Sequence, residues 1–274
     1  MSKRILFTDL DGTLLDDQKK ITPGNQSAID EALALGHIIV ISTGRPLVSA
    51  LIQAENLGLV KKGCYVIAYN GAQIYDIYNQ KTIYGHCLPR SLAAPLFRAA
   101  AERDLYIQTY NTTHILTEQN TPELQKYTET IQVPYKIVED IDKALIDDPY
   151  KLIAIDLKSH EKLVAYQQEI LSKYSDSLDS FFSNDFYLEI VPTGISKGFA
   201  VQWMCEFLGI PLENSVAAGD AQNDIAMLEA AHIGAVMCNA FPGIAEHGNY
   251  VTKADNNHDG VAEIIHRFIL KDTI

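Results

Sequence analysis

The sequence is poor in cysteine. The four cysteines, Cys64, Cys87, Cys205 and Cys238, lie far apart and form no C-x-x-C pair. This spacing favours reduced thiols over a disulfide framework or a zinc site. We therefore expect a cytoplasmic protein in which the cysteines are small buried apolar residues.

Long apolar runs are also missing. Asp9 and Asp11 interrupt the N-terminal segment MSKRILFTDLDG too soon for the apolar part of a signal peptide. No run approaches the roughly 18 apolar residues of a membrane span. The composition, with 47% hydrophobic and 21% charged residues, lies near the globular average, which excludes low-complexity and disordered classes.

Positive charge is in deficit, because 22 Lys and Arg face 35 Asp and Glu, for a net charge of -13. A field of that sign repels nucleic acid and anionic lipid at long range. We expect neither as a partner, and no obligate protein partner is evident. Any phosphate group that binds must therefore be met by local groups.

Apolar strands alternate with helices in both terminal parts of the chain. The N-terminal part has a strand at 5–7, a helix at 23–35, a strand at 38–41, a helix at 48–57 and a strand at 65–68. The C-terminal part has a helix at 197–208, a strand at 215–218, a helix at 224–231, a strand at 235–237 and a helix at 260–270. This alternation predicts an α/β protein with a doubly wound parallel sheet.

The pattern changes between these two parts. Strands at 105–110 and 114–117 follow each other closely, which predicts antiparallel pairing. Further elements are expected there, namely helices at 91–103, 122–131 and 161–174 and a strand at 151–157. With 274 residues, enough for about two domains, we expect an α+β domain at 85–187 inserted into a first domain formed by 1–84 and 188–274.

Polar residues end the predicted parallel strands. Asp9 and Asp11 follow the first strand, Ser42–Arg45 the second, Asn70-Gly71 the third and Gly219–Asp224 a later one. In an open parallel sheet, ligands bind outside the carboxyl ends of the strands. Acidic side chains that converge there repel each other unless a cation is bound, and oxygen-only ligands favour Mg²⁺.

These segments together resemble the motifs of the haloacid dehalogenase (HAD) superfamily of phosphoryl-transfer enzymes. The first motif is matched by Asp9-x-Asp11-Gly12-Thr13, the second by Thr43, the third by Lys197 and the fourth by Gly219-Asp220-x-x-Asn223-Asp224. The Cof-type branch and its YidA-like sugar phosphatases are resembled through Ser42-Thr43-Gly44-Arg45, Asn70-Gly71-Ala72 and Asp259-Gly260-Val261-Ala262. The resemblance implies a HAD-like Rossmannoid core. The insertion falls between the second and third motifs, where the resemblance implies a C2 cap that selects the substrate. Its mixture of helices and strands resembles the C2B type.

Asp9 is expected to be the nucleophile. A carboxylate at the end of a buried strand can attack phosphorus and form an acyl phosphate, which divides a difficult hydrolysis into two steps. Asp11 can protonate the leaving alcohol and then deprotonate the attacking water. The resemblance implies that Asp9, Asp220 and, through its backbone carbonyl, Asp11 bind Mg²⁺.

Further donors are expected around the transferred phosphoryl group, because negative charge spreads over its three equatorial oxygens. We expect these donors to be the Lys197 ammonium, the Thr43 hydroxyl, the Leu10 and Gly44 backbone amides and the Asn223 side chain.

Several of these residues keep a second interpretation. A lysine at the start of a helix is most often a solvated surface charge, so only the spacing of the whole motif set favours a catalytic Lys197. Arg45 is either a contact to the substrate or the cap, or a surface arginine. Asp224 either neighbours the metal or orients Lys197, and we favour the second. Asn70-Gly71 is a turn signal in any protein.

The sequence therefore predicts a Mg²⁺-dependent phosphatase of small phosphorylated metabolites, with sugar phosphates as the favoured class. A phosphomutase of the phosphomannomutase type is the alternative within the fold, although the Cof-type forms favour hydrolysis. A non-enzymatic phospho-receiver module also clusters Asp, Thr and Lys, but such modules are about half this length and have no cap. A dehalogenase is disfavoured because Asp11 is a phosphatase feature in the superfamily.

Overall fold

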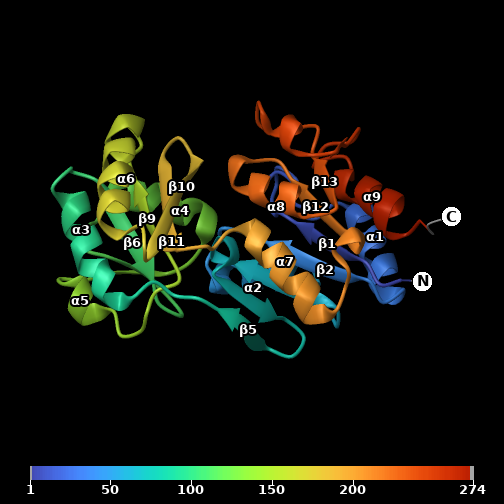
Figure 1. Cartoon of the computed structure of the whole chain (residues 1–274), viewed down its shortest axis with the longest axis horizontal. Coiled ribbons are helices and arrows are strands. Elements are labelled where there is room, and N and C mark those ends of the chain that lie inside the picture. Colours follow the sequence, from blue (N-terminus) through green and yellow to red (C-terminus); the bar gives the residue numbers. More distant parts are fainter. Residues whose placement is uncertain (1, 272–274) are drawn as a thin grey trace. The chain divides into compact units, whose positions relative to one another are not determined.

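The computed structural model of the chain describes residues 2–271 (Figure 1). These residues form two compact units. One comprises the residues up to Gly44, Ala50–Ile83 and the residues from Ser196 on, and the other comprises Arg45–Ser49 and Tyr84–Ile195. Each unit has a sheet of its own.

An eight-stranded sheet forms the centre of the first unit, in the order β14-β13-β12-β1-β2-β3-β4-β5. Its strands are β1 (Ile5–Thr8), β2 (Ile38–Ser42), β3 (Cys64–Ala68), β4 (Gln73–Asp76), β5 (Lys81–Gly85), β12 (Ser215–Gly219), β13 (Ile233–Val236) and β14 (Tyr250–Val251). The strands from β14 to β3 are parallel, and β4 is antiparallel to β3. Every residue of β1 is buried, as expected for a strand covered on both faces.

Helices cover both faces of this sheet. They are α1 (Pro23–Ala34), α2 (Leu47–Asn56), α7 (Lys197–Leu208), α8 (Ile225–Ala230) and α9 (Gly260–Ile264). Helix α1 packs on α9, and α7 packs on α8. The connections β1-α1-β2 and β12-α8-β13 run in opposite directions along the sheet, so right-handed crossovers place α1 and α8 on opposite faces. The predicted doubly wound α/β class is confirmed.

Two C-terminal helices differ from the prediction. The helix expected at 260–270 divides into α9 and a π-helical turn at Ile265–Ile269. The helix expected at 224–231 is α8, preceded by a 3₁₀ turn at Gln222–Asp224. That turn is tight because the Asp224 carboxylate accepts hydrogen bonds from the backbone N–H groups of Asp220 and Ala221.

The second unit has a six-stranded sheet in the order β10-β11-β9-β6-β7-β8. Its elements are α3 (Ala93–Ala101), β6 (Tyr106–Tyr110), β7 (Ile115–Thr117), α4 (Pro122–Ile131), β8 (Tyr135–Ile137), α5 (Ile141–Ala144), β9 (Leu152–Ile155), α6 (His160–Tyr174), β10 (Leu178–Asn184) and β11 (Tyr187–Pro192). The expected antiparallel pairing of β6 and β7 is confirmed. Helices α3 and α6 lie side by side (Figure 1) and bury Leu96 and Leu163 in one apolar cluster with Leu188.

The boundaries of the two compact units differ from those of the predicted domains. Strand β11 pairs with β10 and β9, with Leu188 opposite Ala154. These ladders keep the chain in the second unit up to Ile195, whereas the sequence places the junction after residue 187. The assignment of the two units as catalytic core and cap stays a prediction.

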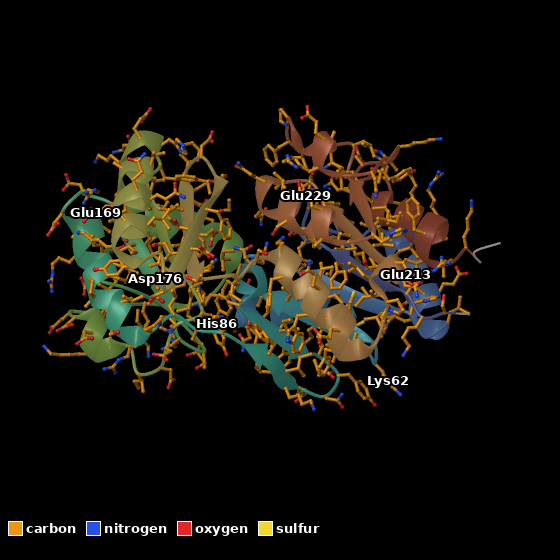
Figure 2. All side chains as sticks on the ribbon, in the orientation of Figure 1. Lys62, His86, Glu169, Asp176, Glu213 and Glu229 are labelled. Atoms are coloured by element: carbon orange, nitrogen blue, oxygen red, sulfur yellow. The ribbon has the colours of Figure 1, made fainter. Side chains whose placement is uncertain are left out.

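Charged side chains of the first unit such as Lys62, Glu213 and Glu229 are exposed (Figure 2). No helix within residues 2–271 is both long and apolar enough to cross a membrane. Buried charge is therefore the exception in this fold, and much of it gathers at one edge of the parallel sheet.

Candidate active site

Two aspartates lie at the carboxyl ends of adjacent parallel strands. Asp9 follows β1 and Asp220 follows β12, and the Asp9 backbone N–H donates to the Ala218 carbonyl at 3.0 Å, which extends the β1–β12 ladder. Both side chains are buried. Parallel pairing thus brings together acidic residues from the two ends of the chain, at the edge where ligands bind in such sheets.

Lys197 joins this pair to a third aspartate. It is the first residue of α7, whose N-cap Ser196 accepts a hydrogen bond from the Phe199 N–H. Its Nζ lies 2.6 Å from Asp9 Oδ1 and 2.6 Å from Asp224 Oδ1. The side chain has 0% exposure, so the interpretation of Lys197 as a solvated surface charge is wrong.

Both oxygens of Asp224 have partners. Oδ1 accepts from Lys197, while Oδ2 accepts from the backbone N–H groups of Asp220 and Ala221, each at 3.1 Å. A carboxylate held in this way fixes the lysine that it contacts and fixes the turn after β12. The geometry favours an orienting role for Asp224 over direct metal binding.

The turn after β1 packs closely on Asp220. Thr13 Oγ1 donates to Asp220 Oδ1 at 2.8 Å. Gly12 has a φ of 84°, and a β-carbon at this position would lie 2.5 Å from Asp220 Oδ2. Only glycine adopts this conformation readily and leaves that space free, so Gly12 lets the Asp11–Thr13 turn approach the carboxylate.

Asp11 is more exposed than the other acidic residues of the site. Its Oδ1 pairs with Lys19 Nζ at 2.8 Å, and the Asp11 side chain is 36% exposed. Lys19 is a left-handed residue in the loop before α1, with a φ of 61°. Nothing in the sequence singles it out, because it belongs to no motif and its backbone conformation is not visible in the residue types around it.

Burial and like charge dominate the electrostatics of the cluster. Burial raises the pKa of Asp9 well above its usual value, Lys197 lowers it, and Asp224 and Asp220 raise it again. Burial also raises the pKa of Asp220 to about 6. The pKa of Lys197 is raised, because Asp224 and Asp9 outweigh the opposite effect of burial. Three carboxyl groups thus lie around one lysine, and the raised pKa values show that ionising all of them together is unfavourable without a further cation.

A divalent cation fits this donor set. Carboxylate oxygens of Asp9, Asp220 and Asp224 lie within 4.8 Å of one another. Mg²⁺ prefers oxygen donors over sulfur or nitrogen. A cation would offset the burial and the like-charge repulsion that raise the pKa values of Asp9 and Asp220. Because both carboxylate oxygens of Asp224 already accept hydrogen bonds, Asp9 and Asp220 are the carboxylates best placed to hold the cation.

The predicted phosphoryl-binding residues lie beside this cluster in sequence. Leu10 directly follows Asp9, and Asn223 directly precedes Asp224. Thr43 follows β2 and is buried, and its N–H donates to the Ile67 carbonyl at 2.8 Å. Gly44 comes next. Their roles toward a phosphoryl group stay predictions.

Arg45 is not a surface arginine. Its side chain is 4% exposed, and its Nη1 donates to Ser49 Oγ at 3.4 Å. The Ser49 hydroxyl in turn donates to the Ile131 carbonyl at the end of α4. This burial removes the surface alternative. Residues Arg45–Ser49 cluster with the second unit, and a contact of Arg45 with the substrate or the cap stays a prediction.

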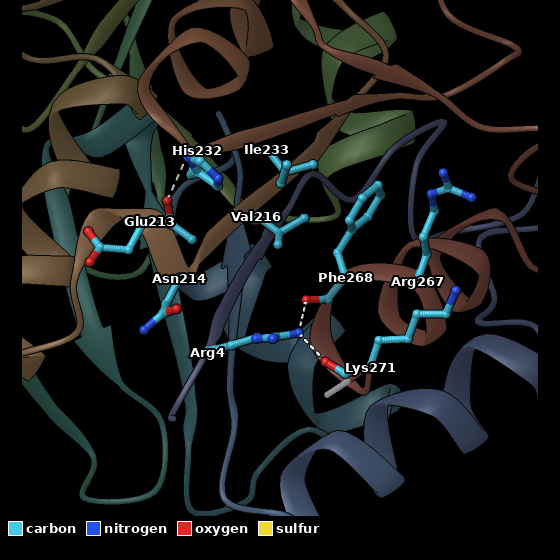
Figure 3. A pocket seen from close by; sticks show the side chains of 10 residues that line it. Arg4, Glu213, Asn214, Val216, His232, Ile233, Arg267, Phe268 and Lys271 are labelled. Carbon is cyan, nitrogen blue, oxygen red and sulfur yellow. Dashed lines mark hydrogen bonds between the residues drawn. The ribbon is translucent and has the colours of Figure 1, made fainter. Parts of the chain in front are cut away.

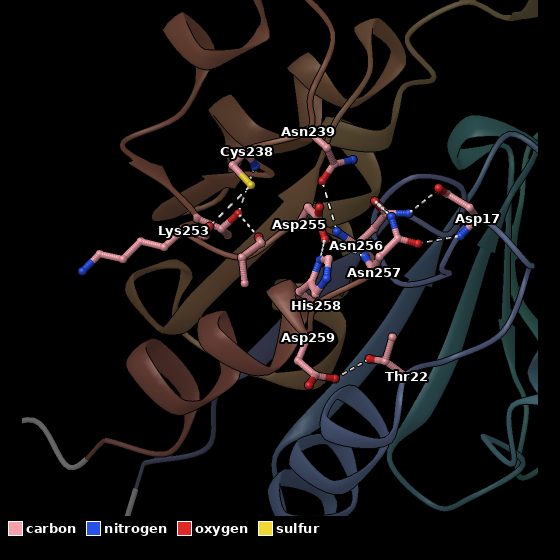
Figure 4. A network of polar contacts seen from close by, with 12 residues as sticks. Asp17, Thr22, Cys238, Asn239, Lys253, Asp255, Asn256, Asn257, His258 and Asp259 are labelled. Carbon is pink, nitrogen blue, oxygen red and sulfur yellow. Dashed lines mark hydrogen bonds and ion pairs between the residues drawn. The ribbon is translucent and has the colours of Figure 1, made fainter.

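Sequence reasoning missed a set of asparagines that hold the turn after β1. Asn239 Nδ2 donates to the Gly12 carbonyl at 2.8 Å, and Asn256 Nδ2 donates to the Leu15 carbonyl at 3.0 Å. Figure 4 shows this network continuing to Asp17 and, separately, Asp259 accepting from Thr22. The only sequence signal for these asparagines was the motif beginning at Asp259, which follows Asn256 closely in the chain.

A cavity of about 590 Å³ lies at the opposite edge of the same sheet (Figure 3). It is lined by residues at the amino ends of β12 and β13, such as Val216 and Ile233. Arg4 Nη1 donates there to the carbonyls of Phe268 and Lys271, each at 2.7 Å. Because Asp9 and Asp220 follow the carboxyl ends of their strands, this cavity is no part of their site.

The fold is α/β, and its cluster combines a buried aspartate, a lysine that bridges two carboxylates and three carboxylates that could hold a cation. The chain belongs to the haloacid dehalogenase-like hydrolases, which match residues 6–265. The predicted family and the prediction of an enzyme of the phosphatase class are confirmed.

Relatives cover nearly the whole chain. A Streptococcus pyogenes protein that is named as a phosphatase is 32% identical over 285 residues, covering 98% of this chain and 100% of the relative. The 5-amino-6-(5-phospho-D-ribitylamino)uracil phosphatase YcsE of Bacillus subtilis is 28% identical, covering 97% and 96%. A haloacid dehalogenase-like hydrolase from Bacteroides thetaiotaomicron, of known crystal structure, has a TM-score of 0.88 and 28% identity, covering 97% and 99%.

Proposed function

We propose that the chain is a Mg²⁺-dependent phosphatase that hydrolyses small phosphorylated metabolites, with sugar phosphates as the favoured class, through a phosphoaspartate on Asp9. The observation that carries this proposal is the buried bridge from Asp9 through Lys197 to Asp224, beside Asp220. It combines a fixed carboxylate, a fixed cation and an excess of negative charge at the ligand-binding edge of the sheet.

Asp9 performs the first step. Lys197 holds Oδ1 and so orients the carboxylate, which leaves Oδ2 to attack phosphorus. A bond forms between Oδ2 and phosphorus while the bond from phosphorus to the leaving oxygen breaks. The leaving alcohol takes its proton from Asp11. The products of this step are the alcohol and phosphorylated Asp9.

Asp11 then reverses its role. Its carboxylate removes a proton from water, the water oxygen bonds to phosphorus, and the bond to Asp9 Oδ2 breaks, which releases phosphate and restores both carboxyl groups. Because Asp11 Oδ1 pairs with Lys19, the carboxyl group must exchange this partner for the leaving oxygen.

Asp9, Asp220 and the Asp11 backbone carbonyl would hold Mg²⁺, which would supply positive charge to the phosphoryl oxygens. Lys197 supplies a second positive charge, and the Thr43 hydroxyl and the Gly44 N–H supply hydrogen bonds.

Two observations support a small phosphorylated substrate. The net charge of -13 disfavours long polyanions at long range. The Bacillus subtilis relative is named for a phosphorylated ribityl compound.

We further propose that the second unit is the C2B-type cap that selects among such substrates. The four cysteines are free, which supports a cytoplasmic setting; Cys64 and Cys205 are buried as expected, whereas Cys87 is only partly buried and Cys238 is exposed.

A screen of phosphorylated metabolites with Mg²⁺ present tests this function. Stoichiometric phosphate release from a sugar phosphate is the expected result. Formation of an isomeric sugar phosphate without phosphate release would instead support the phosphomutase alternative, and the absence of any reaction across the screen would contradict both.

A further inference from the structure

The turn that follows β3 has an unusual backbone. Tyr69, Asn70 and Gly71 have φ values of 51°, 57° and 113°, so three successive residues are left-handed. Glycine tolerates this region and asparagine visits it, but a bulky tyrosine rarely does. Such conformations persist only where the surrounding structure enforces them, and they concentrate at functional sites.

The Asn70 side chain adds a second unfavourable feature. It is 1% exposed, and among residues 2–271 neither its Oδ1 nor its Nδ2 has a hydrogen-bond partner. A buried polar atom without a partner destabilises the folded state. Asn70 therefore combines backbone strain with two unpaired amide atoms, which is a poor choice if stability alone decides the residue.

The turn lies next to the Thr43–Gly44 segment, and this position explains how Asn70 can act on phosphoryl binding. The Asn70 N–H donates to the Thr43 carbonyl at 3.1 Å. That carbonyl and the Gly44 N–H belong to the same planar trans peptide and point in opposite directions. The hydrogen bond from Asn70 therefore fixes the direction of the Gly44 N–H, one of the donors assigned to the phosphoryl group.

The carboxamide also packs against Gly44. A β-carbon built on Gly44 would lie 3.0 Å from Asn70 Oδ1 and 3.2 Å from Asn70 Nδ2. The amide thus lies at the face of Gly44 where a side chain would project, and it limits the movement of the Thr43–Gly44 segment.

We propose that Asn70 is a positioning residue for phosphoryl binding, which acts through Thr43 and Gly44. Its carboxamide and its backbone N–H hold the Thr43 hydroxyl and the Gly44 N–H in the directions that a phosphoryl group requires. This inference rests on the proposed phosphatase function. A role of Asn70 in phosphoryl binding, and not in stability, explains both the backbone strain and the unpaired amide atoms.

The variant Asn70→Gly separates this role from a structural one. Glycine accepts the left-handed backbone and keeps the N–H, but it removes the carboxamide. We expect the affinity for orthovanadate, measured with Mg²⁺ present, to fall at least tenfold while the melting temperature stays equal or rises. A lower melting temperature or a failure to fold would assign Asn70 a structural role and overturn the proposal, as would unchanged vanadate affinity.

Asn25 in α1 provides a matched control. It is also buried and its Nδ2 also has no partner within residues 2–271, but its Oδ1 accepts from the Ala262 N–H at 2.7 Å. Asn25→Ala should therefore lower the melting temperature and leave vanadate affinity unchanged. If it weakens vanadate binding as much as Asn70→Gly, the effect is general and the proposal fails.

A double-mutant cycle with Thr43→Val tests the route of action. If Asn70 acts through Thr43 and Gly44, Asn70→Gly should weaken vanadate binding less in the Thr43→Val protein than in the natural one. Independent, multiplicative losses would overturn that route. Failure of the natural protein itself to bind vanadate or to release phosphate would be a different result, because it contradicts the proposed function on which this inference depends.

Discussion

Each unit of the molecule buries a lysine against carboxylates, and the two arrangements differ in charge balance. In the second unit Lys151 pairs with Glu189 at 2.7 Å, one cation with one anion, and Ser183 Oγ donates to Glu189 Oε1. In the first unit Lys197 contacts two aspartates, with Asp220 close by. A balanced pair is complete by itself, whereas the cluster around Lys197 needs further positive charge. We therefore expect charge imbalance to be the feature that separates the proposed active site from a structural ion pair here.

Asp9→Asn should give the largest effect on activity. An amide is a poor nucleophile at phosphorus but has the shape of the carboxyl group, so we expect turnover to fall by at least about 10³-fold while the fold is kept. Steady-state phosphate release and circular dichroism measure the two properties. The matched change in the other pair, Glu189→Gln, should instead lower stability by about 3–5 kcal/mol, because it leaves Lys151 buried without its anion. More than about one tenth of the natural rate in Asp9→Asn would remove Asp9 from the reaction.

Removal of Mg²⁺ should affect the cluster around Lys197 and leave the Lys151–Glu189 pair unchanged. With EDTA we expect turnover to fall by about 10²–10³-fold and to return with Mg²⁺. Mg²⁺ should also raise the melting temperature of the natural protein and of Glu189→Gln by similar amounts, and of Asp220→Ala by much less. Full activity in chelator would contradict the metal site.

Replacing each lysine sharpens the comparison further. Lys197→Ala should lower turnover by at least about 10²-fold, because a fixed cation near the transferred phosphoryl group is lost. Lys151→Ala should chiefly lower stability. Turnover is measured below the melting temperature of both variants, with Lys158→Ala as the control for a lysine outside both arrangements. Equal turnover in Lys197→Ala and Lys158→Ala would show that charge imbalance does not mark the reactive site.

The pH dependence of stability should give the smallest effect. Burial raises the pKa of Asp220 to about 6, so between about pH 4 and pH 6 the folded protein holds a proton that the unfolded chain releases. The contribution of Asp220 to stability therefore falls as the pH rises through this range, by about 3 kcal/mol at most.

The variant Asp220→Asn isolates that contribution from the other carboxyl groups. In chelator it should be as stable as the natural protein near pH 4 and more stable at pH 7. Urea unfolding at several pH values measures the difference. A natural protein that gains stability relative to Asp220→Asn as the pH rises would have the opposite sign from the one expected.

Much of the first unit could be predicted from the sequence because its strands are short apolar runs that end in polar residues. A strand buried on both faces requires such a run, and the parallel order then fixes which ends meet. Asp9 and Asp220 were predicted in this way, whereas Lys197, the first residue of a helix, was predicted from the spacing of the whole motif set. The hairpin β4–β5 and the strand β11 were missed, because edge and mixed-polarity strands lack that signal.

Contacts that depend on side-chain geometry could not be predicted. The pairs Lys19–Asp11 and Lys151–Glu189 join residues that belong to no common pattern. The left-handed turn at Asn70 looks like any Asn-Gly turn in the sequence, and its unpaired carboxamide is visible only in the fold. The sequence thus predicts the chemically reactive residue types of the site, whereas the residues that position them can be identified only from the structure.

The most direct test of the central claim is a crystal structure with beryllium fluoride and Mg²⁺, which imitate a phosphorylated carboxylate. The account predicts a beryllium fluoride adduct on Asp9 Oδ2, with Lys197 near its fluorine atoms and Mg²⁺ between Asp9 and Asp220. An adduct on another carboxylate, such as Asp11, or a protein that forms none at saturating beryllium fluoride, would contradict the assignment of Asp9 as the nucleophile.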